Sequence, residues 1–252
     1  VPFIAMLLGY QLDDSIRLFS VATSLIFLGL TGLFLVMDLD RPDRFLNVLL
    51  RPQWKSWLVK GGYTISIFGL LMTIWGASTL LGWNLPETGF LWVTAVFAVI
   101  LAIYTAFLFA QAKGRDFWQS PTLPLHMLVH SLLAGGAVFA IMSLVFDFSL
   151  WNSLVRHILL AGIVVNVLTL VSELTITHPT KAAKKVVHMI LKEEYKNKFW
   201  IGTVLLGNVI PLILLLTTGN MILLGVSGVL VLIGMYITEK IWIEGPQRIP
   251  LA

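Results

Sequence analysis

The sequence predicts an all-α integral membrane protein of about eight transmembrane helices, the first of them truncated, arranged as two four-helix bundles. Three observations predict this class. Of the 252 residues, 58% are hydrophobic and 12% charged, with a mean hydropathy of +0.89, whereas soluble domains carry about 25% charged residues. Seven apolar stretches have the length of a membrane helix. Basic residues gather in alternate connections between these stretches.

The predicted helices follow one another with polar, Pro- or Gly-containing connections between them. Residues 1–9, "VPFIAMLLG", are too short to span a bilayer and lack the features of a signal peptide. We therefore expect them to be the last part of a helix that begins upstream. Each full stretch is about 20 residues long, as membrane helices are and barrel strands are not. The seven spans are predicted at residues 16–38, 62–83, 89–112, 123–146, 153–176, 199–218 and 220–241.

The basic residues are sorted to one side of the predicted membrane. Of the 17 Lys and Arg residues, only Arg17 and Arg156 fall at the opposite side. The others follow the second, fourth and sixth helices or lie near the C-terminus. The positive-inside rule assigns this basic face to the cytoplasm.

We expect two structural parts. Residues 1–146 would form an N-terminal bundle of the partial helix and helices 2–5 with the binding site, and residues 147–252 would supply helices 6–8. The second part contains the Lys-rich segment 178–198, "HPTKAAKKVVHMILKEEYKNK". This segment is interpreted as an interfacial helix against anionic lipid, or as a docking surface for an acidic partner, and the two interpretations are compatible.

Polar and titratable side chains occur at similar depth beneath the basic face, on several different helices. Such groups are costly inside a membrane and are therefore candidates for function. His126 and His130 are four residues apart and lie on one stripe of the fifth helix. Single acids lie near the ends of the second, sixth and eighth helices. The full set of candidates is Asp38, Tyr104, Gln111, His126, His130, Glu173 and Glu239.

An acid, an imidazole and an arginine in an apolar, water-adjacent pocket suit the head group of a quinol. The carboxylate or imidazole accepts the hydroxyl proton as electrons leave, and a permanently charged Arg keeps a carboxylate ionised. The same groups would also serve an ion-translocating transporter. For His126 and His130 the structural alternative is packing hydrogen bonds. Asp40, Arg41 and Asp43 are interpreted as interfacial salt-bridge residues at a helix end.

Several other chemistries are disfavoured by the sequence. The chain has no Cys, which excludes disulfides, thiolate metal sites and iron–sulfur ligation within it. "HMLVH", residues 126–130, has the spacing of metal ligands but no third ligand nearby in the sequence. Bis-histidine haem needs histidines on two facing helices, and no glycine-rich phosphate loop is present. We therefore expect no metal, no haem and no nucleic-acid partner.

Two sequence blocks resemble the NrfD/PsrC family, the membrane subunits of polysulfide, nitrite and related respiratory oxidoreductases, with relatives in alternative complex III. The blocks are "DLDRPDRFLNVLLRPQWKSWLVKGGY" and "YTAFLFAQAKGRDFWQSPTLPLHMLVHSLLAGGA", and the likeness ends at "EGPQRIPL". The resemblance implies a cofactor-free protein that binds menaquinone or ubiquinone near the membrane surface. Asp38, Arg44, His126 and His130 would line or adjoin that pocket. Glu173 falls in the bundle where relatives are proposed to conduct protons.

The resemblance also implies partners and a location. Electrons would pass between the quinone and a docked ferredoxin-like iron–sulfur subunit. A molybdopterin or other catalytic subunit, or a cytochrome c subunit, would complete the complex in a bacterial or archaeal cytoplasmic membrane. The catalytic subunits of several relatives lie outside the cytoplasm, whereas the charge bias here favours a cytoplasmic catalytic arm. Candidates for partner docking are Arg51, Trp54, Lys55, Lys113 and Arg115.

Three functional hypotheses follow. The first, which we favour, is a quinone-reactive membrane subunit of an oxidoreductase. The second is a subunit of a redox-driven ion pump, in which Glu173, Glu239 and Tyr104 form a proton path. The third is a secondary transporter or a purely structural anchor. Transporters tend to contain broken helices near mid-membrane, and Pro211 interrupts one of the predicted spans.

Overall fold

The computed structural model describes residues 1–37, 50–146, 149–177, 180–217 and 220–250, and these residues form helices and connections without a strand. Within them, seven stretches are long and apolar enough to cross a membrane. The predicted class, an all-α integral membrane protein, is confirmed. The seven predicted spans correspond one to one to these seven stretches, and the largest shift is in the last one, which continues to Gln247.

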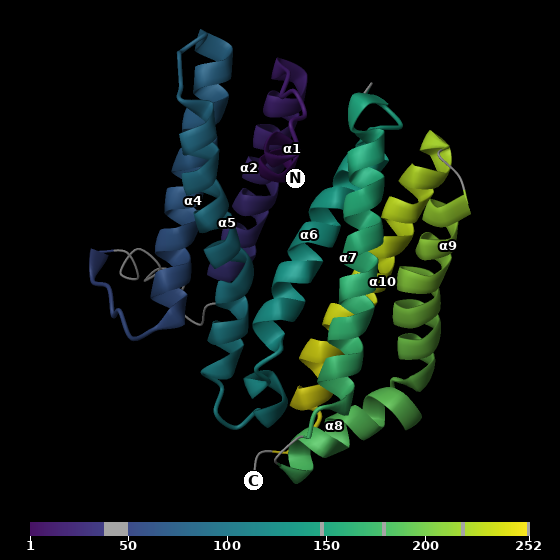
Figure 1. Ribbon diagram of the computed structural model, residues 1–252. Coiled ribbons are helices and arrows are strands. Elements are labelled where there is room, and N and C mark those ends of the chain that lie inside the picture. Colours follow the sequence, from purple (N-terminus) through teal and green to yellow (C-terminus); the bar gives the residue numbers. More distant parts are fainter. Residues whose placement is uncertain (38–49, 147–148, 178–179, 218–219, 251–252) are drawn as a thin grey trace. The chain divides into compact units, whose positions relative to one another are not determined.

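The chain packs as two compact units, Val1–Leu108 and Phe109–Ala252 (Figure 1). The helix named α6 packs with α7 and α10 in unit 2, whereas the sequence analysis grouped it with residues 1–146. Unit 1 contains α1 (Pro2–Leu7), α2 (Asp14–Met37), α4 (Trp57–Leu81) and most of α5 (Glu87–Ala110). Unit 2 contains η2 (Asp116–Gln119), α6 (Leu123–Met142), α7 (Ser149–Thr175), α8 (Lys181–Lys192), η3 (Lys198–Val209), α9 (Ile210–Thr217) and α10 (Met221–Gln247).

Unit 1 is held together at one end by an apolar cluster and an ion pair. Arg17, at the start of α2, donates a hydrogen bond to Glu87 at the start of α5 over 2.8 Å. The same carboxylate accepts from the indole of Trp75 on α4, so all three long helices meet there. The buried residues of the apolar cluster are Val21, Met72, Trp75 and Leu91.

The helices of unit 2 approach closely through glycines. Gly207 on η3 and Gly234 on α10 face each other, and a Cβ on either residue would collide with the backbone of the other. Small residues of this kind let membrane helices pack at short distance. η3 is a π-helix, in which the backbone turn is wider than in an α-helix. The close crossing brings the side-chain oxygens of Thr203 on η3 and Thr238 on α10 to 2.9 Å from each other.

Helix α8 is an amphipathic helix that runs across the ends of α7 and η3 (Figure 1). Thr180 caps its N-terminus by accepting a hydrogen bond from the backbone of Ala183 at 3.2 Å. Its apolar face, which includes Val186 and Ile190, is buried. Its lysines, Lys181, Lys184, Lys185 and Lys192, are exposed on the opposite face.

Candidate functional site

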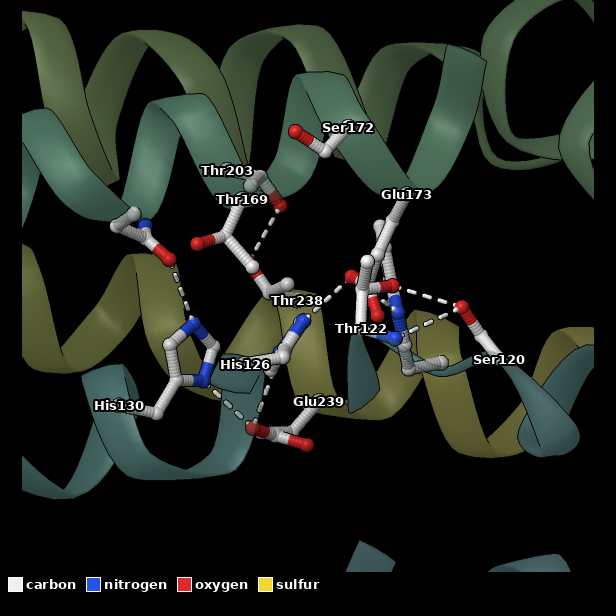
Figure 2. Close-up of polar contacts among 12 residues, drawn as sticks. Ser120, Thr122, His126, His130, Thr169, Ser172, Glu173, Thr203, Thr238 and Glu239 are labelled. Carbon is white, nitrogen blue, oxygen red and sulfur yellow. Dashed lines mark hydrogen bonds and ion pairs between the residues drawn. The ribbon is translucent and has the colours of Figure 1, made fainter. Parts of the chain in front are cut away.

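Four titratable side chains meet inside unit 2, and we call them the His–Glu cluster: His126, His130, Glu173 and Glu239 (Figure 2). His126 and His130 are one turn apart on α6, and their ring centroids are 4.2 Å from each other. Both imidazoles are buried, as is Glu173. Each carboxylate comes from a different helix, Glu173 from α7 and Glu239 from α10. The cluster therefore ties three membrane helices together.

His126 is bound to Glu173. The distance between His126 Nδ1 and Glu173 Oε2 is 2.7 Å. The indole nitrogen of Trp242 donates to the same carboxylate oxygen at 3.2 Å. These two contacts replace the water that a carboxylate loses when it is buried. The other ring nitrogen of His126, Nε2, is buried and has no hydrogen-bond partner.

Glu239 lies between the two imidazoles. Its Oε1 atom is 2.6 Å from His130 Nδ1 and 3.5 Å from His126 Nε2. The Glu239 side chain is 29% exposed, whereas the side chains of the other three members are at most 5% exposed. Glu239 is therefore the member of the cluster that outside groups can reach.

A chain of amides fixes which nitrogen of His130 carries hydrogen. The carbonyl oxygen of Thr203 can only accept, so the side-chain nitrogen of Asn208 donates to it, at 2.7 Å. Asn208 Oδ1 then accepts from Asn166 Nδ2 at 2.9 Å. Asn166 Oδ1 in turn lies 3.1 Å from His130 Nε2. Because that oxygen accepts, Nε2 of His130 carries the hydrogen.

One proton must then lie between His130 and Glu239. With Nε2 protonated, a neutral imidazole leaves Nδ1 bare. A bare nitrogen 2.6 Å from an ionised carboxylate would be repulsive. Either His130 is an imidazolium or Glu239 is a carboxylic acid. In both cases the short contact holds a proton that can move between the two groups, which is the property needed for acid–base chemistry.

An aromatic layer separates the cluster from a cavity on the basic face. Phe117 lies edge-on to Trp242, with 5.8 Å between ring centroids, and the indole nitrogen of Trp118 donates to the backbone oxygen of Trp242 at 2.8 Å. Phe117 also lines the cavity, which has a volume of about 420 Å³. The charged residues of its lining are Lys113, Arg115 and Asp116.

The other predicted binding residues have different surroundings. Asp38 and Arg44 lie outside the described residues. Tyr104 is buried in unit 1 with its ring against Gly61. Gln111 is exposed just beyond the end of α5. The structure thus brings four of the predicted residues together, the two histidines and the two glutamates that the sequence analysis assigned to separate roles.

The predicted docking residues also differ among themselves. Arg51, Trp54 and Lys55 are exposed near the start of α4 in unit 1, and Lys113 is exposed in unit 2. Arg115 instead donates hydrogen bonds to the backbone carbonyls of Pro246 and Ile249. It therefore holds the C-terminal segment in place.

Three residues of the site were missed by sequence reasoning, Asn166, Asn208 and Trp242. The two amides lie within apolar spans, "GIVVNVLTL" and "LLGNVIPL", and the rule that selected Glu173 would have selected them. In the folded chain a third potential ligand does lie near the two histidines. Glu239 is distant in sequence, but one ligand atom each from His126, His130 and Glu239 lie within 4.8 Å of one another.

Comparison with known proteins identifies a family for the chain. The family model described as polysulphide reductase, NrfD, matches residues 10–247. No curated protein matches the chain.

Proposed function

Because the chain belongs to the polysulphide reductase NrfD family, we propose that it exchanges protons with a membrane quinone through the His–Glu cluster. Membership makes it a membrane subunit of a quinone-linked oxidoreductase complex. The chain has no cysteine and hence no iron–sulfur cluster of its own. Electrons from a menaquinol or ubiquinol would therefore leave to a docked iron–sulfur subunit, or arrive from it when the quinone is reduced.

The arrangement of the cluster supports this proposal. Oxidation of a quinol releases two electrons and two protons, and the protons need acceptors whose protonation can change. The cluster offers two imidazoles and two carboxylates in direct contact. The buried members of the cluster bind one another, so a quinol hydroxyl would reach Glu239 first and transfer its proton to that carboxylate. Glu239 would then transfer a proton to His130 or His126. Acid–base groups placed in this way typically contribute about 10²–10⁴-fold in rate.

Taken by itself, unit 1 has an apolar groove whose size and lining suit the isoprenoid tail of a membrane quinone. The groove has a volume of about 640 Å³ and lies between α2 and α4. Leucines and glycines line most of it, among them Leu28, Gly29, Gly32 and Gly69. Apolar clefts of about 300–1,000 Å³ are the usual size of ligand sites. Glycines in this lining leave room for a bulky chain next to the helix backbone.

Filling the groove should weaken quinol binding. A Cβ on Gly32 would meet nothing within 4 Å, so Gly32→Leu adds volume without a clash in the folded protein. We expect the KM for a long-chain quinol to rise about tenfold, about 1.4 kcal/mol of lost tail contact, with kcat unchanged. Gly89→Leu on α5 is the matched control, because its Cβ also meets open space outside this groove. Equal KM values for both variants and the unaltered protein would show that the quinol tail does not bind in this groove.

Proton translocation is a second candidate function. The hydrogen-bonded chain continues beyond the cluster through Asn166 and Asn208 to the backbone of η3. These amides do not ionise, so the chain fixes the orientation of His130, and the groups that can carry a proton are the members of the His–Glu cluster. Tyr104, proposed above as a third member of such a path, lies in unit 1.

We also propose that the basic face is cytoplasmic, with the iron–sulfur and molybdopterin or cytochrome c partners docked there. The exposed lysines of α8 and Lys113 support this orientation. The chain lacks cysteine, so Lys184→Cys can be labelled selectively. In intact cells a membrane-impermeant thiol reagent should leave Lys184→Cys unmodified and should modify the control Asn84→Cys in the opposite connection. The reverse pattern would place the basic face outside.

A further inference from the structure

We propose that the His–Glu cluster is also a binding site for one divalent transition-metal cation such as Zn²⁺, held by His126 Nε2, His130 Nδ1 and Glu239 Oε1. The proposal concerns the metal chemistry of these side chains and does not depend on the quinone reaction. A proton and a metal ion would then compete for the same three atoms.

The ligand atoms are placed for such an ion. His126 and His130 present one nitrogen each from neighbouring turns of α6, and the carboxylate of Glu239 comes from α10. Two histidines and one glutamate are a known ligand set for zinc. In a tetrahedral site with bonds of about 2.0–2.2 Å, ligand atoms lie about 3.3–3.6 Å apart, and His126 Nε2 and Glu239 Oε1 are 3.5 Å apart.

The orphan nitrogen of His126 is the observation that points most directly to a ligand. His126 is fully buried, and its Nε2 atom has no hydrogen-bond partner. A buried polar atom left unpaired is costly unless another group satisfies it. With Nδ1 donating to Glu173, Nε2 keeps a free lone pair, and that lone pair is on the side of Glu239. A cation at this point would satisfy it.

The surroundings hold both imidazoles in the form that binds metal. Metal-bound histidines almost always donate their other ring N–H to a carboxylate or carbonyl. For His126 the acceptor is the carboxylate of Glu173 at 2.7 Å. For His130 the acceptor is Asn166 Oδ1 at 3.1 Å, in a direction fixed by the amide chain that ends at Thr203. Neither arrangement needs to change when a metal ion enters.

The charges balance for a divalent ion. When both imidazoles are neutral and both carboxylates ionised, the cluster carries two negative charges, which one M²⁺ neutralises. Without metal, the proton between His130 and Glu239 offsets one of these two charges. Binding therefore follows M²⁺ + cluster·H⁺ → M²⁺·cluster + H⁺. The 2.6 Å contact between His130 and Glu239 must open, and Glu239 can move because it is partly exposed.

A titration of the full-length subunit in lipid nanodiscs with Zn²⁺, against a competing fluorescent chelator, tests the site. We expect one tightly held Zn²⁺ per chain, with one proton released in weakly buffered solution as the ion replaces the proton between His130 and Glu239. Glu239→Gln should abolish tight binding, and Glu173→Gln should weaken it by about 10–100-fold. His188→Ala is the control. His188 lies 3.3 Å from Glu193 in an exposed pair at the end of α8, which is where a metal ion bound only at the surface could be held.

A second measurement uses only the unaltered subunit and therefore does not depend on how well a variant folds. It records the visible absorption spectrum of bound Co²⁺. A four-coordinate site gives intense bands, whereas a weakly held surface ion stays six-coordinate and pale. Absence of stoichiometric binding, a six-coordinate spectrum, unchanged affinity in Glu239→Gln, or loss of the ion in His188→Ala would each overturn the proposal.

Discussion

The Glu239→Gln variant should lose quinol-coupled electron transfer by about 10²-fold or more, at the scale expected for a general acid–base group. Glu239 is the partly exposed member of the His–Glu cluster, and its Oε1 atom lies near ring nitrogens of both histidines. A glutamine has nearly the same shape but cannot take up a proton. The measurement is kcat for a soluble quinol with the purified complex, together with its size on gel filtration to show that it assembles.

Glu244→Gln is the matched control for this variant. Glu244 lies on the same helix, five residues later, and pairs with Lys240 at 3.7 Å in an exposed position. Its replacement removes a carboxylate without touching the cluster, so turnover should stay within about twofold, as small effects of exposed ion pairs suggest. Full activity in Glu239→Gln, or an equal loss of kcat in both variants, would show that the cluster takes no part in the quinone reaction.

The spans of this protein could be predicted because hydropathy on the scale of a bilayer is a property of the sequence alone. The grouping of the helices could not, because it depends on which faces of the helices fit together. Gly162 on α7 accommodates Leu133 of α6, and contacts of this kind assign α6 to unit 2. The π-helical turn of η3 likewise could not be predicted, because the hydropathy pattern of an apolar stretch does not distinguish a π-helix from an α-helix.

The depth of the site residues was predictable, whereas their pairing was not. His126 and Glu173 both lie near helix ends on the same face, but their contact depends on the rotation of α6 and α7 about their axes. The partners of His130 came from two further helices, Asn166 on α7 and Glu239 on α10. A neutral amide is a weaker functional signal than an acid because it is less costly in a membrane, although Asn166 sets the hydrogen position on His130.

Replacing Glu173 with glutamine should uncouple proton movement from electron flow. The Glu173 carboxylate is 2.7 Å from His126 Nδ1 and would be the counter-ion of a protonated His126. An amide cannot play that role, and an unpaired buried charge is strongly destabilised, so a proton arriving at Glu239 would no longer pass to His126. We expect proton uptake in proteoliposomes to slow by about 10²-fold, with the KM for quinol unchanged. A pH-sensitive dye trapped in the vesicles measures it.

Two further variants separate this role from simple packing. Trp242→Phe keeps an aromatic ring beside the cluster but removes the N–H that donates to Glu173, so proton uptake should slow by less than in Glu173→Gln. Ser172→Ala, at the exposed neighbouring position on α7, should behave as the unaltered protein. Unchanged proton stoichiometry in Glu173→Gln would contradict the path. A parallel loss of electron transfer would contradict it as well, since Glu173 would then belong to the quinone reaction itself, together with Glu239.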